Sequence, residues 1–231
     1  LSLHDALPIF GGTGMCISAD IVREFGWGCD CLTEDMEFSM KCLSHGIRTC
    51  WVHDAIIYDE KPLTFMASWR QRKRWAQGQF DCSERYIPIL MKEGFKRHSI
   101  VVLDGIMQLL QNYFLLISAF YLVMTYINMF YPCFTVVLYN DALVPRQFWS
   151  VLGTIQYVLP LIVLLQIEVP AKIYLYWLIY PVFMYSWVPV TFLGWIHRHE
   201  KQWVHTIHTR SMQFQAASLT RKIGRASCRE R

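Results

Sequence analysis

Polar and apolar residues are distributed unevenly along this chain of 231 residues. Up to about residue 98 the two kinds are mixed, whereas the later part is dominated by apolar residues. Three apolar runs stand out, at residues 106–139, 151–167 and 173–196. Because a helix needs about 20 apolar residues to cross a bilayer, this pattern predicts transmembrane helices within residues 106–196. Buried core helices of a soluble protein are the alternative.

The residues that flank the last apolar run support membrane crossing. Aromatic side chains lie near both of its ends, namely Tyr174, Tyr176 and Trp177, then Trp187 and Trp195. Such rings are enriched at membrane–water interfaces. Residues 168–172 predict a tight turn between the last two runs.

Residues 82–105 connect the polar part to the apolar runs. Between Cys82 and residue 98, apolar side chains alternate with Lys92 and Lys96. The mixture predicts an amphipathic segment in the membrane interface, with basic side chains toward anionic headgroups. A soluble surface helix broken at Pro88 is the alternative.

Two short helices are predicted near the start of the polar part. Glycines at 11–14 predict a turn, in which Gly14 would let a ligand approach the backbone. Ser18 is expected to cap a helix at residues 19–25, which Gly26 ends. A second helix is expected from Thr33, as its N-cap, to about Ser44.

Strands are predicted after the second helix. Residues 47–53 and 55–58 are rich in β-forming side chains. A further helix, capped by Thr64, is expected to end near Gln79. The order helix, strand, strand, helix predicts an α/β domain at residues 10–81.

The composition narrows the classes of partner. The chain is 54% hydrophobic and 15% aromatic, which is high for a soluble protein. The formal net charge of +4 includes several arginines close to the C-terminal end, so it gives little support for nucleic-acid binding. We therefore expect membrane lipid, and no nucleic acid, as a partner.

The eight cysteines have no metal-binding spacing. Cys29 and Cys31 stand one residue apart, and no pair of CxxC motifs occurs in the sequence. Free thiols in a reducing compartment are the prediction.

The two ends of the chain can be encoded by opposite strands of one DNA sequence. Residues 222–231 can be encoded by a string whose reverse complement, read one base in, encodes residues 1–9. That string resembles a sequencing-library adapter. We expect both segments to be artefacts and exclude them from fold reasoning.

The last helix of the polar part carries the densest group of candidate binding residues. At 3.6 residues per turn, one face holds Gln71, Arg74, Trp75 and Gly78. The guanidinium offers two parallel donors for phosphate oxygens, and the indole offers a flat face for a sugar or base. The alternative is a solvated basic helix whose Trp69 and Trp75 anchor at the membrane.

Two motifs now stand in order before the apolar runs. Thr33-Glu34-Asp35 resembles the TED motif, and Gln71-Arg72-Lys73-Arg74-Trp75 the QxxRW motif, of processive family-2 glycosyltransferases. That group contains cellulose, chitin, hyaluronan and poly-N-acetylglucosamine synthases. The resemblance implies an α/β fold: the second half of a GT-A-type glycosyltransferase domain, followed by a helical transmembrane region.

The resemblance also implies a catalytic base. Asp35 would take the proton from the acceptor hydroxyl, with Glu34 beside it. The family's earlier Asp and DxD motifs, which hold the nucleotide and its divalent metal, would lie upstream of residue 10. A Mg²⁺ or Mn²⁺ cofactor is therefore implied, with no metal ligand expected in this chain.

The remaining motif residues are implied to bind substrate. Gln71, Arg74 and Trp75 would line the acceptor end and the diphosphate, with Thr33 beside them. Arg74 would offset the charge that builds on the departing nucleotide diphosphate.

The expected protein is a multi-pass, inverting glycosyltransferase (hexosyltransferase type) of the cell membrane with a cytoplasmic catalytic part. It would transfer sugar from a nucleotide-diphosphate sugar to a growing polysaccharide and pass the product through its own helices. Residues 197–221 are expected to be a cytoplasmic juxtamembrane tail, because basic residues favour that side. A single-transfer enzyme with a lipid acceptor and a catalytically inactive scaffold or channel are the alternatives.

Overall fold

The computed structural model describes residues 10–52, 55, 57, 59–97, 99–131, 146–166 and 169–201. The expected artefact segments 1–9 and 222–231, and the tail beyond residue 201, lie outside these residues. The helices of the described part are α1 (Ala19–Phe25), α2 (Glu34–Ser44), α3 (Phe65–Arg97), α4 (Ile100–Phe130), α6 (Arg146–Leu165), α7 (Lys172–Tyr185) and α8 (Trp187–Ile196).

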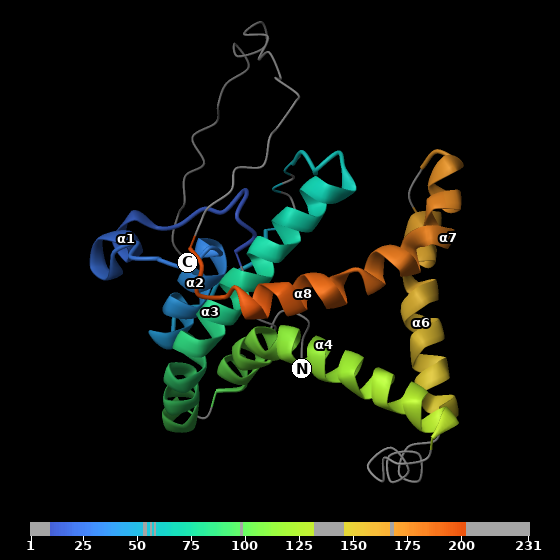
Figure 1. Cartoon of the computed structure of the whole chain (residues 1–231). Coiled ribbons are helices and arrows are strands. Elements are labelled where there is room, and N and C mark those ends of the chain that lie inside the picture. Colours follow the sequence, from blue (N-terminus) through green and yellow to red (C-terminus); the bar gives the residue numbers. More distant parts are fainter. Residues whose placement is uncertain are drawn as a thin grey trace, which may run out of the picture.

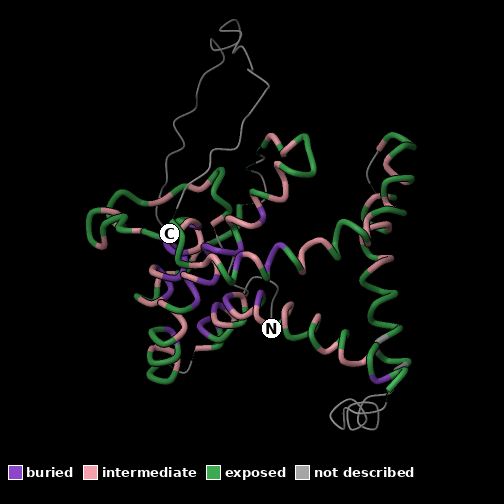
Figure 2. The backbone as a smooth tube through the Cα atoms, viewed as in Figure 1, coloured by how far each residue is buried: buried purple, intermediate pink, exposed green. Residues whose placement is uncertain are grey.

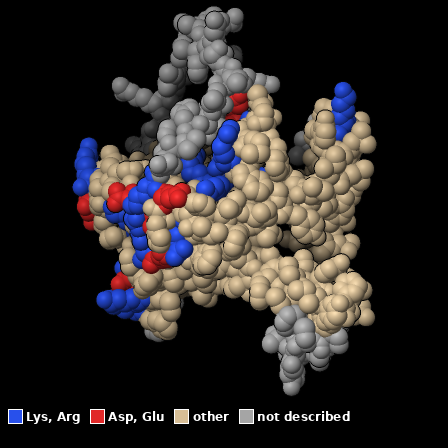
Figure 3. Space-filling model, viewed as in Figure 1, with Lys and Arg blue, Asp and Glu red and all other residues tan. Residues whose placement is uncertain are grey.

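Helix α3 lies at the centre of the end of the molecule that also contains α1 and α2, called the polar end below (Figure 1). Helices α2, α4 and α8 pack against it, while α6 and α7 lie together at the far side. The buried residues gather where α2, α3 and the first half of α4 meet, and α6 and α7 are mostly exposed (Figure 2). Charged side chains cluster around the polar end, whereas the α6 and α7 side is largely uncharged on the face shown in Figure 3.

Local capping explains where the first helices begin and end. The Ser18 hydroxyl accepts a hydrogen bond from the Asp20 N–H at 3.3 Å, and Gly26 ends α1 with a φ of 65°. Thr64 caps α3 through a 3.2 Å hydrogen bond from the Ala67 N–H to its hydroxyl. The predicted caps are confirmed. The short side-chain oxygens accept hydrogen bonds from N–H groups at the start of the helix, which have no partner within the helix.

The predicted end of α3 near Gln79 is wrong. The helix continues for 33 residues to Arg97, with Pro88 inside it. A proline removes one hydrogen bond from the helix that contains it, so tertiary packing must stabilise α3 around Pro88. Cys82 and Leu90, one before and one after Pro88, are both 0% exposed in the core.

Residues 82–105 accordingly contribute to the core shared by α2, α3 and α4. The buried members of this core are Cys31, Met40, Leu43, Cys82, Leu90, Val101, Val102 and Leu109. The opposite side of the segment keeps large apolar side chains exposed, among them Met91 and Phe95. The apolar side chains of the segment are therefore divided between the core and the surface, and its place in the membrane interface stays a prediction.

The first predicted strand is absent from the described part of its range. Residues 47–52 carry no regular secondary structure, and 53, 54, 56 and 58 lie outside the described residues. A strand requires a hydrogen-bonded neighbour, and the described residues contain no strand to provide one. Helices form most of this part of the chain, and the α/β architecture remains an expectation.

Two helical segments among the described residues are long and apolar enough to cross a membrane. They are Ile100–Phe130 and Lys172–Ile196, and the apolar part of α6, Ser150–Leu165, is shorter. Protein covers only 28% of the first segment's apolar window and 17% of the second's. A core helix of a soluble protein would be mostly covered, so the alternative of buried core helices is disfavoured.

The last apolar run, predicted as one helix, is divided at Ser186. Helix α7 ends at Tyr185 and α8 begins at Trp187. Pro189 has no N–H to donate to the carbonyl of Tyr185, so the hydrogen-bond ladder is interrupted at this point.

Helices α6 and α7 form the predicted hairpin. The Trp177 ring stacks on Tyr157 with centroids 4.3 Å apart, and its indole N–H donates to the Tyr157 carbonyl at 3.3 Å. Trp177 thus packs against α6, while its place at a membrane interface stays a prediction.

Helices α3 and α8 approach closely because Gly194 faces α3. A Cβ at Gly194 would lie 2.5 Å from the Ala76 Cβ and 3.2 Å from the Gln77 backbone nitrogen. Farther along, Gln77 donates to the His197 carbonyl at 2.9 Å, and Arg198 pairs with Glu84 at 2.6 Å. Small residues at a helix contact bring the two backbones together.

We expect Gly194→Ala to destabilise the protein by about 1–3 kcal/mol, because the added methyl overlaps the Ala76 Cβ on α3. Gly153→Ala is the matched control, since a Cβ at this position in α6 has no atom within 4 Å. The control should be neutral or stabilise by up to about 1 kcal/mol through helix propensity. Thermal unfolding of the detergent-solubilised protein measures both, and equal effects would contradict the close approach.

Candidate functional site

Asp35 lies in the first turn of α2, beside the glycine turn of residues 11–14. A Cβ built on Gly12, whose φ is 70°, would lie 3.1 Å from the Asp35 Oδ2 atom. The other carboxylate oxygen accepts a hydrogen bond from the Met36 N–H at 2.8 Å. The turn therefore runs directly against the predicted base, and only glycine fits there without strain.

The pKa of Asp35 is raised from its ordinary value of 3.8. Burial is the largest cause, because it disfavours the charged form, and the charge of Glu34 adds to it. The hydrogen bond from Met36 and the positive charge of Arg74 act in the opposite direction. A carboxylate with a raised pKa is a stronger base once it is deprotonated.

The TED motif meets the helix that carries the QxxRW motif through Thr33 and Gly78. A Cβ at Gly78 would lie 2.6 Å from the Thr33 hydroxyl oxygen and 2.7 Å from its backbone nitrogen. The space that Gly78 is predicted to leave beside the motif residues is thus filled by the start of α2. Thr33 precedes α2 as predicted, but its side chain makes no capping hydrogen bond, because it is buried against α3.

The predicted substrate-binding residues occupy one stretch of α3. Gln71 and Arg74 are half-buried, and Trp75 is 39% exposed. The charge of Arg74 acts on the pKa of Asp35, which places the two side chains in one electrostatic environment. Gly14 has a φ of 71° and lies against Ile57, so its described neighbour is a loop side chain rather than Asp35.

Arg72 is not part of an exposed basic patch. Only 2% of it is exposed, so the alternative of a solvated basic helix does not hold for this residue. One turn contains about 3.6 residues, and consecutive side chains therefore point in different directions.

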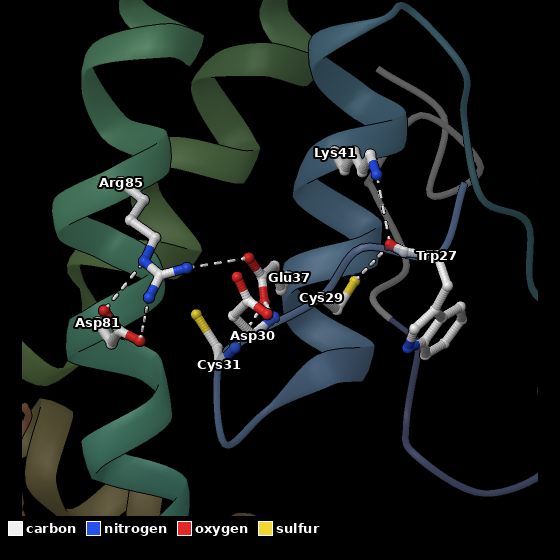
Figure 4. Close-up of polar contacts among 8 residues, drawn as sticks. All are labelled: Trp27, Cys29, Asp30, Cys31, Glu37, Lys41, Asp81 and Arg85. Carbon is white, nitrogen blue, oxygen red and sulfur yellow. Dashed lines mark hydrogen bonds and ion pairs between the residues drawn. The ribbon is translucent and has the colours of Figure 1, made fainter. Parts of the chain in front are cut away.

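Glu37 anchors the loop that leads into the TED motif (Figure 4). One of its oxygens, Oε2, accepts hydrogen bonds from the Asp30 and Cys31 N–H groups, each at 2.7 Å. The other oxygen lies 3.5 Å from Arg85, which also pairs with Asp81 at 2.9 Å. Glu37 is 3% exposed and thereby ties the loop, α2 and α3 together.

Sequence reasoning missed the role of Glu37. It was one of three acids in the first turn of α2, where the helix dipole alone explains an acid. Its distinguishing partner, Arg85, stands 48 residues later, so no local signal identifies the pair.

A second anchor holds the segment after α1. The Lys41 ammonium donates to the carbonyls of Gly26 and Trp27, at 3.1 and 3.3 Å. The Cys29 thiol donates to the same Trp27 carbonyl at 3.1 Å (Figure 4). Burial raises the pKa of Cys29 to about 12, so this thiol stays protonated and is a poor nucleophile.

A metal site is not formed by the described part of the chain. It contains no group of three or more His, Cys, Asp or Glu side chains able to hold a metal ion. The described part of the structure contains two apolar cavities. One, of about 690 Å³, lies between α6 and α7, and the other, of about 340 Å³, lies among α4, α6 and α7. Their linings include none of the predicted site residues.

A family model described as glycosyl transferase family group 2 matches residues 1–196. The chain belongs to this family. The enzyme class implied by the two motifs, a glycosyltransferase, is thereby confirmed at the level of the family, whereas the match does not establish the processive group. No solved structure matches the chain.

Two relatives share part of the sequence. A probable glycosyltransferase, YdaM, from Bacillus subtilis (strain 168) is 34% identical over 68 residues, which cover 29% of this chain and 16% of the relative. A probable glucomannan 4-beta-mannosyltransferase 3 from Arabidopsis thaliana is 31% identical over 77 residues, or 33% of this chain and 14% of the relative. The chain thus aligns with less than a fifth of the length of either relative.

We expect Glu37→Gln to destabilise the protein by about 1–3 kcal/mol, because it weakens charge-assisted hydrogen bonds inside the protein. Glu24→Gln, an exposed site on α1, is the matched control and should change stability little. Chemical denaturation compares the two variants. A Glu37→Gln protein as stable as the control would show that the loop does not depend on this carboxylate.

Proposed function

We propose that this chain is part of an inverting glycosyltransferase that uses a nucleotide-diphosphate sugar, with Asp35 as the catalytic base. The observation that supports this most directly is the placement of Asp35. It lies against the glycine turn, with a raised pKa and within the electrostatic influence of Arg74. A base and a phosphate-binding cation are the two groups that this transfer needs from the protein.

The proposed reaction is a single displacement. The acceptor hydroxyl oxygen forms a bond to the anomeric carbon of the donor, and its proton passes to the Asp35 carboxylate. The bond from that carbon to the diphosphate oxygen breaks, and its electron pair leaves with the nucleotide diphosphate. Arg74 stabilises this departing charge, while Gln71 and the exposed ring of Trp75 hold the acceptor sugar.

We further propose that the protein is embedded in the cell membrane as a multi-pass enzyme with a cytoplasmic catalytic part. The two long apolar segments and the small share of them that protein covers support this. The concentration of charged side chains at the α1–α3 end agrees with a polar end outside the bilayer (Figure 3).

A growing polysaccharide is the proposed acceptor, with export through the membrane helices. The aromatic ring of Trp75 suits a sugar acceptor. The name of one relative also refers to a polysaccharide, glucomannan. Product length on a gel separates this proposal from single transfer to a lipid.

Asp35→Asn should lower glycosyl transfer by about 10²–10⁴-fold, because the amide cannot accept the proton. The assay uses membranes carrying the full-length protein and a panel of radiolabelled nucleotide sugars. Asp20→Asn, on the exposed face of α1, is the matched control and should keep wild-type activity.

Stability distinguishes a lost base from a lost fold. The pKa of Asp35 in the folded protein lies above its ordinary value of 3.8. Ionisation of this carboxyl group therefore destabilises the folded state as the pH rises from the ordinary pKa through the folded-state pKa. Asp35→Asn should therefore be at least as stable as wild type at neutral pH. Equal transfer by wild type and Asp35→Asn would remove Asp35 as the base.

The acid limb of kcat/KM should report the ionisation of Asp35, because activity requires the deprotonated form. Arg74→Gln removes a charge that lowers this pKa, so the limb should move to higher pH. Glu34→Gln removes a charge that raises it, so the limb should move to lower pH. Shifts in the same direction, or no shift, would contradict the assignment.

A further inference from the structure

Arg72 is the most buried charged side chain that the structure describes, at 2% exposed. It stands two residues before Arg74 on α3. Two residues correspond to about 200° around a helix, so the two guanidinium groups point to nearly opposite sides. Arg74 acts on Asp35, whereas Arg72 points to the junction of α7 and α8.

Three aromatic rings and one hydroxyl enclose the Arg72 guanidinium. Its central carbon lies 4.4 Å from the ring centroid of Phe183, 5.2 Å from that of Trp187 and 5.7 Å from that of Phe65. Its Nη1 donates to the Ser186 hydroxyl at 2.8 Å. Phe183, Ser186 and Trp187 span the junction of α7 and α8, so one side chain of α3 contacts both helices.

This arrangement is costly for a charged group. Among the described residues no carboxylate pairs with Arg72, and its Nη2 has no hydrogen-bond partner. Burial lowers the pKa of Arg72, which reports the same penalty. A long apolar side chain would fill this space without that penalty, so stability alone does not explain an arginine here.

We propose that Arg72 is a positioning residue that fixes the junction of α7 and α8 to the acceptor-binding helix α3. Contacts of Gly194 and Arg198 already join α8 to α3, and Arg72 adds the end of α7. The junction thereby keeps the acceptor held by Gln71 and Trp75 aligned with the membrane helices. This inference rests on the proposed glycosyl transfer.

Arg72→Met tests the role directly, because it removes the charge and the directed hydrogen bond while keeping a long apolar side chain. We expect unchanged or higher thermal stability, an unchanged KM for the donor, and a kcat about 10- to 100-fold lower through misalignment of the acceptor. Arg70→Met, exposed on the same helix, is the matched control and should behave as wild type. Arg72→Lys should recover part of the lost kcat, since it restores the cation among the rings.

Ser186→Ala provides a second variant from the other side of the contact. It keeps Arg72 and removes only the hydroxyl, so it should lower kcat with an unchanged KM for the donor. A wild-type kcat in Arg72→Met would overturn the proposal. So would a clear loss of stability in Arg72→Met, which would assign the arginine to folding.

A distance measurement tests positioning without any activity. Nitroxide labels at Ile89→Cys on α3 and Leu178→Cys on α7 occupy exposed positions, in a background whose other cysteines have been replaced. Arg72→Met should broaden the distance distribution between the labels, and an unchanged distribution would overturn the proposal. If wild type transfers no sugar from any donor, the proposed function fails, while the label distances still decide whether Arg72 fixes the junction.

Discussion

The close approach of Thr33 to Gly78 determines how the two halves of the candidate site meet. Because residue 78 has no side chain, the start of α2 lies against the backbone of α3. Asp35 follows Thr33 by two residues, and Arg74 precedes Gly78 by one helical turn. On another side of the same turn, Ala76 and Gln77 meet Gly194. One turn of α3 therefore sets the position of the predicted base and of a membrane-length segment at once.

Three charged side chains near this turn are buried or partly buried, and they differ in the partners that surround them. Glu37 is almost fully buried, and its carboxylate is satisfied by two N–H groups and Arg85. Asp35 accepts a hydrogen bond from the Met36 N–H, and burial raises its pKa. Arg72 is enclosed by rings and leaves one donor unused. Full satisfaction is typical of a structural charge, whereas a raised carboxylate pKa or a buried donor without a partner is more often found at a functional position.

Much of the local structure was predictable from the sequence because local chemistry determines it. Ser18 and Thr64 cap helices through hydrogen bonds within three residues. The contacts made by Glu37 and Arg72 were not predictable, because their partners stand 48 and 114 residues away. The continuation of α3 through Pro88 also depends on tertiary packing, which outweighs a local helix breaker. The motif residues predict the site, and long-range packing determines the geometry in which they lie.

The hairpin of α6 and α7 is joined to the remainder of the protein differently from α8. Trp177 of α7 stacks on Tyr157 of α6, and α7 continues into α8 through Ser186. Most of the hairpin is exposed, whereas the buried residues gather around α3 (Figure 2). Such a region forms its own cooperative unit, with a lower free energy of opening than the core. In detergent, amide hydrogens of α6 would therefore exchange with solvent while those of α3 remain protected.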